Sequence, residues 1–347
     1  MGKKDRNITI YTISKELGIS PSTVSRALRG SPLVKDETRE KVLSLSNKLG
    51  YTSNFTAKSL RSGKSYTIAV LSDDITNPFF ALMMKGIEEV LIKEHYNVIL
   101  GNIENDLDKA LKYFNILTQR SIEGVIYINP EGKGTRYLQK TDIFPIVFTY
   151  TSPPSQTSIP SVVPDNLYGG YIATEYLVRL GHKKIAILVG PLDFQASIDR
   201  LEGYKKCLED YNINVDLSLI KYCGDWGQEN GYKQMKDLLS SGNLPTAVIA
   251  GNDLIAVGIM DAVREMGLKI PGDISIIGYD NRDICNFTRP KLTTIDLSLV
   301  EIGRKSAELL IRLINGEILD GNLLFKIKGE LVIRDSCSLK GGDVSEG

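Results

Sequence analysis

From residue 66 onward, short runs of valine and isoleucine alternate with amphipathic segments of helical length. Each apolar run is typical of a buried strand, and the runs are YTIAVL, NVILG, EGVIYI, PIVFTY, KIAILVG, TAVIAG, ISIIGYD and LTTIDL. The helical segments between them cover residues 79–93, 107–119, 168–180, 198–210, 230–240, 254–266 and 299–314. Strands that alternate with helices predict an α/β fold whose parallel sheets are covered on both faces.

The number of these strand–helix units bears on the architecture. About eight units are more than one open sheet usually holds, so the pattern favours two lobes. A ligand site is then expected at the carboxyl ends of the strands. A (βα)8 barrel is the structural alternative, because periodicity alone does not exclude it.

The first 65 residues show a different pattern, made of short helices without strands. Residues 9–18 predict one helix that ends at Gly18. Ser20 is a favourable N-cap and Pro21 suits a first helical turn, so a second helix begins there. Residues 36–49 predict a third helix, and residues 53–65 are compatible with a further short one.

The second of these helices has a narrow apolar stripe. Val24, Ala27 and Leu28 cluster on one side, where they can pack on the preceding helix. The opposite arc is polar, and its residues are Pro21, Ser22, Ser25, Arg26 and Arg29. Two helices joined by a tight turn, the second with an arginine-bearing outer face, are typical of a helix-turn-helix.

This polar arc has the chemistry of a major-groove contact. Arg26 can donate two hydrogen bonds to guanine O6 and N7, while Ser22 and Ser25 can reach base edges or phosphates. Arg29, Lys35 and Arg39 would contact phosphates, so they are expected to supply positive charge without a preference for base sequence.

Charge supports a polyanion partner for the N-terminal part. The whole chain has a net charge of zero, but residues 1–65 hold 13 Lys or Arg and 5 Asp or Glu, a net charge of +8. The remainder therefore has a net charge of −8. The basic stretch TAKSLRSGK also carries one leucine, which can wedge between base steps of a minor groove.

Other function classes lack their signatures. The N-terminus has no apolar run like a signal peptide, and no stretch reaches the ~20 apolar residues of a membrane span, so we expect a cytoplasmic protein without a membrane partner. The four cysteines lack metal-ligand spacing, so we expect reduced thiols and no metal. GxSxG, HExxH and phosphate-loop motifs are absent, and His182 suits a structural role at a helix end. No enzyme activity and no cofactor are expected.

Several motifs, in their order, resemble the lactose/galactose-repressor family of bacterial transcription regulators. The resemblance covers about residues 8–335, and its motifs are ITIYTISKELGISPSTVSRALRGSPLVKDETREKVLSLSNKLGYTSN, AKSLRSGKSYTIAVL, NPFF, LGHKKIAILVGP, DRLEGY, GDW, PTAVIAGNDLIAVGIM and DISIIGYDN…PKLTTI. It implies an all-α helix-turn-helix domain and a two-lobed core similar to periplasmic sugar-binding proteins.

The resemblance also sets the expected boundaries. They are residues 1–52 for the helix-turn-helix domain, 53–65 for a hinge helix and linker, 66–340 for the effector-binding and dimerisation core, and 341–347 for a polar tail. Lobe 1 would hold about 66–165 and 295–327, and lobe 2 about 166–292 and 328–340.

The family binds pseudo-palindromic double-stranded operators as homodimers, and its contact positions carry over to this chain. Pro21, Ser22 and Arg26 match the base-reading positions of the recognition helix. Leu60 matches the hinge leucine that opens the central base step, and Ala57 and Arg61 match its neighbours in the groove.

The family's effector cleft maps onto residues that mostly follow predicted strands. The set resembles a sugar site, because Asp, Asn and Arg pair with neighbouring hydroxyls and an aromatic face stacks on a pyranose. These residues are Asp74, Phe79, Tyr150, Phe194, Arg200, Trp226, Asn252 and Asp280.

We therefore expect a DNA-binding repressor whose operator affinity is switched by a small effector, most simply a sugar. Induction and corepression are both compatible with the sequence. One alternative is a repressor of the same fold that responds to a purine or to a protein partner. A solute-binding receptor is a further alternative, against which the basic N-terminal module and the missing signal peptide argue.

Overall fold

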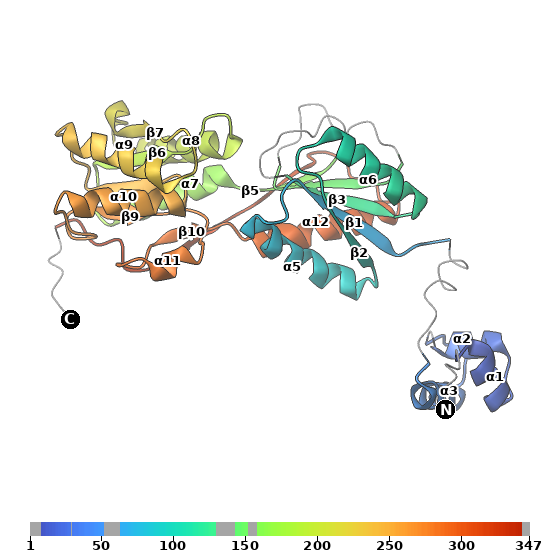
Figure 1. Ribbon diagram of the computed structural model, residues 1–347. Helices are drawn as coiled ribbons and strands as arrows, with labels where there is room; N and C mark the ends of the chain where they lie inside the picture. Colours follow the sequence, from blue (N-terminus) through green and yellow to red (C-terminus); the bar gives the residue numbers. More distant parts are fainter. Residues whose placement is uncertain (1–7, 29, 52–62, 130–142, 152–157, 342–347) are drawn as a thin grey trace, which may run out of the picture. The chain divides into compact units, whose positions relative to one another are not determined.

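The structure is a computed structural model that describes residues 8–28, 30–51, 63–129, 143–151 and 158–341. It divides into two units, residues 1–66 and residues 67–347 (Figure 1). The expected hinge segment lies largely outside the described residues. Within the described part of the chain, none of the helices combines the length and the apolar character that a membrane crossing requires.

The first unit is a small three-helix domain. Its apolar centre contains Ile13, Val24 and Val42, which are fully shielded from solvent. The second helix begins as the sequence predicts, because Oγ of Ser20 accepts a hydrogen bond from the N–H of Thr23 over 3.1 Å. The helices are α1 (Ile10–Leu17), α2 (Pro21–Leu28) and α3 (Asp36–Leu49).

The N-terminal lobe of the second unit is built on one parallel six-stranded sheet. In spatial order its strands are β11 (Leu324–Ile327), β5 (Ser161–Pro164), β4 (Ile146–Thr149), β3 (Gly124–Ile128), β1 (Thr67–Ser72) and β2 (Asn97–Asn102). Helices α5 (Pro78–Lys93) and α12 (Leu299–Ile314) cover one face, and α6 (Leu107–Gln119) covers the other (Figure 1).

The C-terminal lobe repeats this plan with four parallel strands. Its sheet has the order β7 (Ile220–Tyr222), β6 (Ile185–Val189), β8 (Ala247–Ala250) and β9 (Ser275–Ile277). Its helices are α7 (Asn166–Arg179), α8 (Gln195–Asp210), α9 (Gln228–Ser240) and α10 (Asp253–Glu265), with the short α11 (Ile284–Phe287) and the 3-10 turn η2 (Leu217–Leu219).

Alternate residues of the central strands face different cores, as in a sheet covered on both sides. Ile185 and Ile187 of β6 pack with α7 and α8, whereas Ala186 and Leu188 pack with α9 and α10. The two separate sheets exclude the (βα)8 barrel alternative, which needs one closed sheet.

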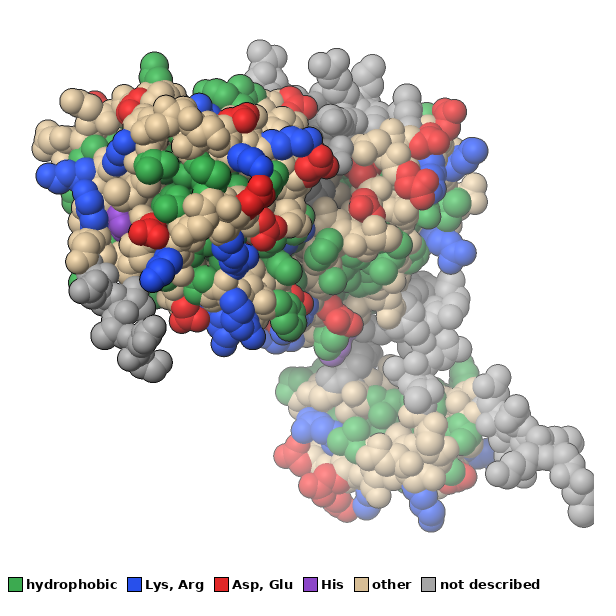
Figure 2. Space-filling view, turned by 60° about the vertical axis from the view of Figure 1, so that its left-hand side comes forward, with side chains coloured by type: hydrophobic (Ala, Val, Ile, Leu, Met, Phe, Trp, Pro, Cys, Tyr) green, Lys and Arg blue, Asp and Glu red, His purple; other side chains and the backbone are tan. Residues whose placement is uncertain are grey.

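The chain passes between the two lobes three times. It crosses after β5, again between β10 (Thr294–Asp296) and α12, and finally between β11 and β12 (Glu330–Val332). β10 and β12 pair in antiparallel fashion, with Thr294 opposite Val332. Over the face of the molecule seen in Figure 2, acidic and basic side chains of the core are interspersed instead of forming a large patch of one sign.

Candidate functional site

A cavity of about 170 Å³ lies at the carboxyl ends of strands from both lobes of the core. The N-terminal lobe contributes three lining residues and the C-terminal lobe seven. They are Asn77, Phe79 and Tyr150 from the first, and Phe194, Ala196, Arg200, Trp226, Asn252, Asp280 and Arg282 from the second. Seven of the eight residues predicted for the cleft therefore meet around one cavity.

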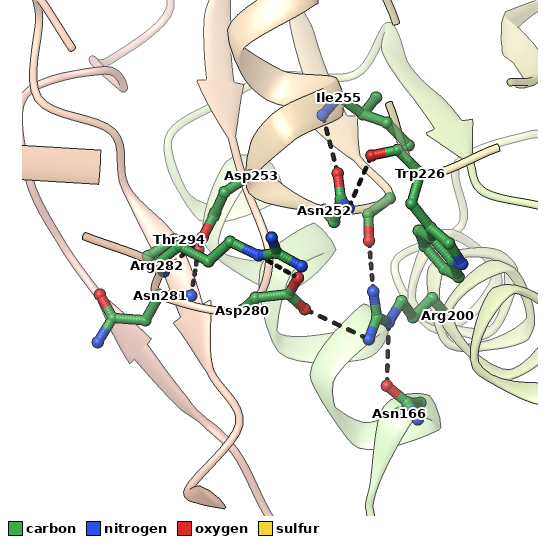
Figure 3. Close-up of polar contacts among 11 residues, drawn as sticks. Asn166, Arg200, Trp226, Asn252, Asp253, Ile255, Asp280, Asn281, Arg282 and Thr294 are labelled. Carbon is green, nitrogen blue, oxygen red and sulfur yellow. Dashed lines mark hydrogen bonds and ion pairs between the residues drawn. The ribbon is translucent and has the colours of Figure 1, made fainter. Parts of the chain in front are cut away.

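Arg200 on α8 is held in place by three acceptors. Its Nε donates to Oδ1 of Asn166 over 2.9 Å, and its Nη1 donates to the carbonyl oxygen of Gly251. Its Nη2 lies 3.7 Å from Oδ1 of Asp280 (Figure 3). Because Arg200 is almost fully buried, these acceptors fix where its positive charge meets a ligand.

Asp280 follows β9 in a backbone conformation with φ of +111°, which is uncommon for a residue with a side chain. Burial raises the pKa of its carboxyl group to about 7, and the charges of Arg200 and Arg282 oppose that rise. Near neutral pH this group can therefore accept hydrogen bonds as a carboxylate or donate one as an acid.

Asn252 and Trp226 are coupled by a hydrogen bond. Asn252 caps α10 with its Oδ1, which accepts from the N–H of Ile255 over 2.8 Å, and its Nδ2 donates to the carbonyl oxygen of Trp226 over 3.1 Å. The Trp226 ring meets Phe194 edge-on, with 5.7 Å between ring centroids. Asn252 thus positions an apolar wall of the cavity as well as lining it.

The opposite wall comes from the N-terminal lobe. Phe79 in the first turn of α5 packs against Tyr150, which follows β4, with 5.8 Å between ring centroids. Burial, together with the nearby charge of Asp280, raises the pKa of Tyr150, so its phenol stays protonated at physiological pH. Aromatic faces and a hydroxyl donor therefore oppose the charged residues of the C-terminal lobe.

Asp74 corrects one sequence-based expectation, because it does not line this cavity. Its Oδ1 accepts from the N–H of Thr76 over 2.8 Å and from Oγ1 of Thr76 over 2.6 Å. These hydrogen bonds lower the pKa of Asp74 and close an exposed turn ahead of α5. The carboxylate is used to shape the loop, and Asn77 enters the cavity from that loop instead.

Three lining residues were not predicted: Asn77, Ala196 and Arg282. Asn77 belongs to the NPFF motif, and Ala196 lies two residues after Phe194, so neighbouring signals pointed to both. Arg282 lies two residues after Asp280, but arginines are common in surface loops, so the sequence gives no signal that this one lines the cavity.

In the first unit, α2 presents Ser22 and Arg26 as exposed side chains, and Pro21 is half-buried. Ser25 is a correction, because only 7% of its surface is exposed and it cannot belong to the outer arc. α2 packs against both α1 and α3, which widens its buried side beyond the apolar stripe of Val24 and Ala27.

Arg39 is a second correction in this unit, because its guanidinium group serves the fold. Nη2 donates to the carbonyl oxygens of Ser31 and Val34, and Nη1 pairs with Asp36. The predicted DNA contacts Arg29, Ala57, Leu60 and Arg61 lie outside the described residues and stay predictions.

His182 has the structural role that its position predicts. Its ring is buried, with Nδ1 3.0 Å from Oγ1 of Thr246 and Nε2 3.1 Å from the carbonyl oxygen of Ser338. Burial lowers the pKa of His182. Among the described residues, no cluster of His, Cys, Asp and Glu has the arrangement of a metal site.

Comparison with known proteins agrees with the two units. Residues 9–54 match the family of bacterial regulatory proteins called the lacI family, and residues 174–337 match a periplasmic binding protein-like domain. Catabolite control protein A of Priestia megaterium is 34% identical over 321 residues, which cover 92% of this chain and 96% of that protein. This chain belongs to the lacI family.

Further relatives of this lacI-family chain are also regulators. The HTH-type transcriptional repressor PurR of Histophilus somni is 32% identical over 331 residues, covering 94% of this chain and 98% of that protein. The crystal structure of the lac repressor dimer bound to operator and an anti-inducer has a TM-score of 0.74 and 28% identity, covering 95% of this chain and 99% of that one. The lacI-family protein described here is accordingly a DNA-binding transcription regulator with an effector-binding core.

Proposed function

We propose that this regulator represses transcription as a homodimer on a pseudo-palindromic operator, and that a sugar bound between the lobes changes its operator affinity. Seven predicted residues from two lobes around one cavity are the observation that carries the proposal. The lac repressor structure, a dimer on its operator, supports the assembly and the partner. Such a protein works in the cytoplasm without a catalytic step or a cofactor.

The lining chemistry supports a sugar as the effector. Arg200 and Asp280 offer a donor and an acceptor that can bind neighbouring hydroxyls, while Trp226 and Phe79 offer apolar ring surfaces. The cavity volume of about 170 Å³ is below the roughly 300–1,000 Å³ of sites for drug-sized ligands. A compact ligand with a single ring therefore suits this site.

The same geometry supports a switch. A ligand that contacts Phe79 and Tyr150 on one lobe and Arg200 and Asp280 on the other binds most tightly at one spacing of the lobes. Such a ligand stabilises the arrangement of the lobes that it binds more tightly, by the difference between its affinities for this arrangement and for the other one. Because residues 53–65 lead directly into β1, a change in the lobes can reach the DNA-binding unit through this segment.

A purine-responsive repressor is the second candidate, and the similarity to PurR supports it. A purine would stack on Trp226 or Phe79 and pair its ring nitrogens with Asp280 and Arg200. The two candidates share DNA binding and differ only in the occupant of the cavity.

One experiment tests both parts of the proposal. Operator sequences are selected from random duplex DNA with the full-length protein, and binding is followed by fluorescence anisotropy with and without sugars or purines. We expect specific binding that weakens steeply with salt and an operator affinity that a sugar shifts at least tenfold. Equal affinity for selected and scrambled DNA would contradict the proposed operator-specific repressor. An operator affinity that purines shift and sugars do not would contradict a sugar as the effector.

A further inference from the structure

Arg282 brings a second cation into the cavity beside the Arg200–Asp280 pair. Its backbone N–H donates to Oδ2 of the buried Asp253 over 2.7 Å, which fixes the main chain at this point. Its side chain lies over Phe79, with 4.8 Å from the guanidinium carbon to the ring centroid. Arg200 and Arg282 reach Asp280 from opposite sides (Figure 3).

Most of the hydrogen-bonding capacity of Arg282 is unused. Its Nε lies 3.4 Å from Oδ2 of Asp280, longer than the roughly 2.8 Å of a strong charge-assisted hydrogen bond. Within the described part of the chain, neither terminal nitrogen of Arg282 has an acceptor. The planar fork that binds carboxylates and phosphates in bidentate fashion is therefore available to a ligand.

The cavity has more positive than negative charge. Two of its described lining residues, Arg200 and Arg282, are cations, and Asp280 is the single carboxylate among them. Arg200 already serves protein acceptors, and burial favours the neutral form of Asp280. A neutral ligand that displaces water from this cavity would leave Arg282 desolvated without a partner, which is costly.

Asn77 adds to this positive side of the cavity. Its Oδ1 caps α5 by accepting from the N–H of Phe79 over 3.0 Å, so its Nδ2 is the part that can donate to a ligand. The first turn of the 16-residue α5 is also the positive end of the helix dipole, which stabilises nearby negative charge.

We propose that the effector is an anionic sugar with a single ring. Its carboxylate or phosphate group binds the fork of Arg282 beside Asn77, and its hydroxyls bind Arg200 and Asp280. This inference rests on the proposed function, in which a sugar occupies the cavity, and it assigns specificity for the charged group to Arg282.

Calorimetry on the full-length protein with matched ligands tests the inference. Three sets are titrated: glucose, glucuronate and glucose 6-phosphate; galactose, galacturonate and galactose 6-phosphate; and ribose with ribose 5-phosphate. We expect one anionic member to bind roughly tenfold to a hundredfold more tightly than its neutral parent. The comparison of uronates with phosphates identifies which anionic group the site takes.

Variants assign this preference to Arg282. Arg282→Gln should remove it, Arg282→Lys should keep part of it because the charge remains, and Arg179→Gln on the exposed side of α7 should leave it unchanged. Denaturant unfolding followed by the fluorescence of Trp226 checks that the core of each variant is folded. Equal affinity for neutral and anionic members, a preference that survives in Arg282→Gln, or binding by no member overturns the inference. A neutral sugar that shifts operator affinity would still uphold the proposed function.

Discussion

The guanidinium group of Arg200 stacks on the ring of Tyr279, with 3.7 Å between the guanidinium carbon and the ring centroid. Burial raises the pKa of Tyr279 to about 12, so the ring stays neutral beneath the charge. Gly169 on α7 makes room for this ring, because a Cβ there would meet the Tyr279 hydroxyl. The guanidinium group of Arg200 is therefore held by a stacked ring, two hydrogen bonds and a carboxylate.

Replacing Arg200 by lysine should damage both the core and its ligand response. Lysine keeps the charge but has no planar fork, so Oδ1 of Asn166 and the carbonyl oxygen of Gly251 lose their donor. We expect the core to lose roughly 2–5 kcal/mol of unfolding free energy in denaturant titrations. Arg179→Lys on the exposed side of α7 is the matched control, with a change within about 0.5 kcal/mol. Equal stability of the two variants would contradict the bonding role of Arg200.

Asp280 should make the stability of the core depend on pH. Burial raises the pKa of its carboxyl group from 3.8 to about 7, so the folded chain binds this proton more tightly than the unfolded chain. Its contribution to stability is full below about pH 4 and is lost as the pH rises to about 7. Asp280→Asn should remove this part of the slope.

The measurement is the difference in unfolding free energy between wild type and Asp280→Asn across that pH window. Burial also raises the pKa of Asp253, and the charge of Asp253 contributes to the raised pKa of Asp280, so the difference reports the titration of Asp280 together with its effect on Asp253. A difference that stays constant, or that favours wild type increasingly as the pH rises, would show that the folded chain keeps Asp280 ionised.

Gly190 sets the position of the Trp226 ring. A Cβ at residue 190 would collide with that ring, so Gly190→Ala should push the indole and change the cavity wall. We expect effector affinity to fall about tenfold while operator binding without effector is retained. Gly272→Ala, at an exposed glycine where a Cβ makes an ordinary contact, should change neither property. Unchanged effector affinity in Gly190→Ala would show that the Trp226 ring does not contact the effector.

The sequence predicted the elements that have a strong period and missed those defined by partners distant in the chain. Residues 299–314 are predicted and observed as the same helix, because their apolar stripe is regular. The sequence analysis does not predict β5 and β11, because β5 has only two valines before Pro164 and Lys326 interrupts the apolar residues of β11. These two strands pair across more than 150 residues of chain. Apolar runs this short or interrupted give little local signal.

The cleft residues were predicted largely through the resemblance, and the exception has a local cause. Asp74 was expected in the cavity, but the hydroxyl of Thr76 two residues later captures its carboxylate in a turn. The sequence places Ser25 on the outer arc of α2, but its side chain is buried. For Asp74, hydrogen bonds to Thr76 that the strand and helix periods do not encode decide where the carboxylate points.

Arg26 should carry sequence discrimination without supporting the fold. Its side chain is exposed on α2, so Arg26→Ala should leave the stability of the first unit within about 0.5 kcal/mol of wild type. We expect it to lose about 1–3 kcal/mol of preference at one base pair of each half-site. Lys48→Ala removes an exposed charge from α3 and should keep that preference. Fluorescence anisotropy with single-base variants of the selected operator measures the base preference of both variants.

Arg39 should support the fold of the first unit without contributing to sequence discrimination. Its Nη2 holds the carbonyl oxygens of Ser31 and Val34 over 2.9 and 3.1 Å, which fixes the loop between α2 and α3. Arg39→Ala should therefore cost the first unit about 1–2 kcal/mol. Hydrogen exchange in residues 8–51 measures this loss, whereas fluorescence of Trp226 follows the core alone.

The salt dependence of operator binding separates this structural role from a phosphate contact. Where the Arg39→Ala variant is folded, the slope of log affinity against log salt should equal that of wild type, because both terminal nitrogens of Arg39 donate to acceptors within the protein. Loss of a phosphate contact would instead reduce the slope by about one. A reduced slope with unchanged hydrogen exchange would place Arg39 at the DNA interface, because the slope counts the phosphate charges that the protein neutralises.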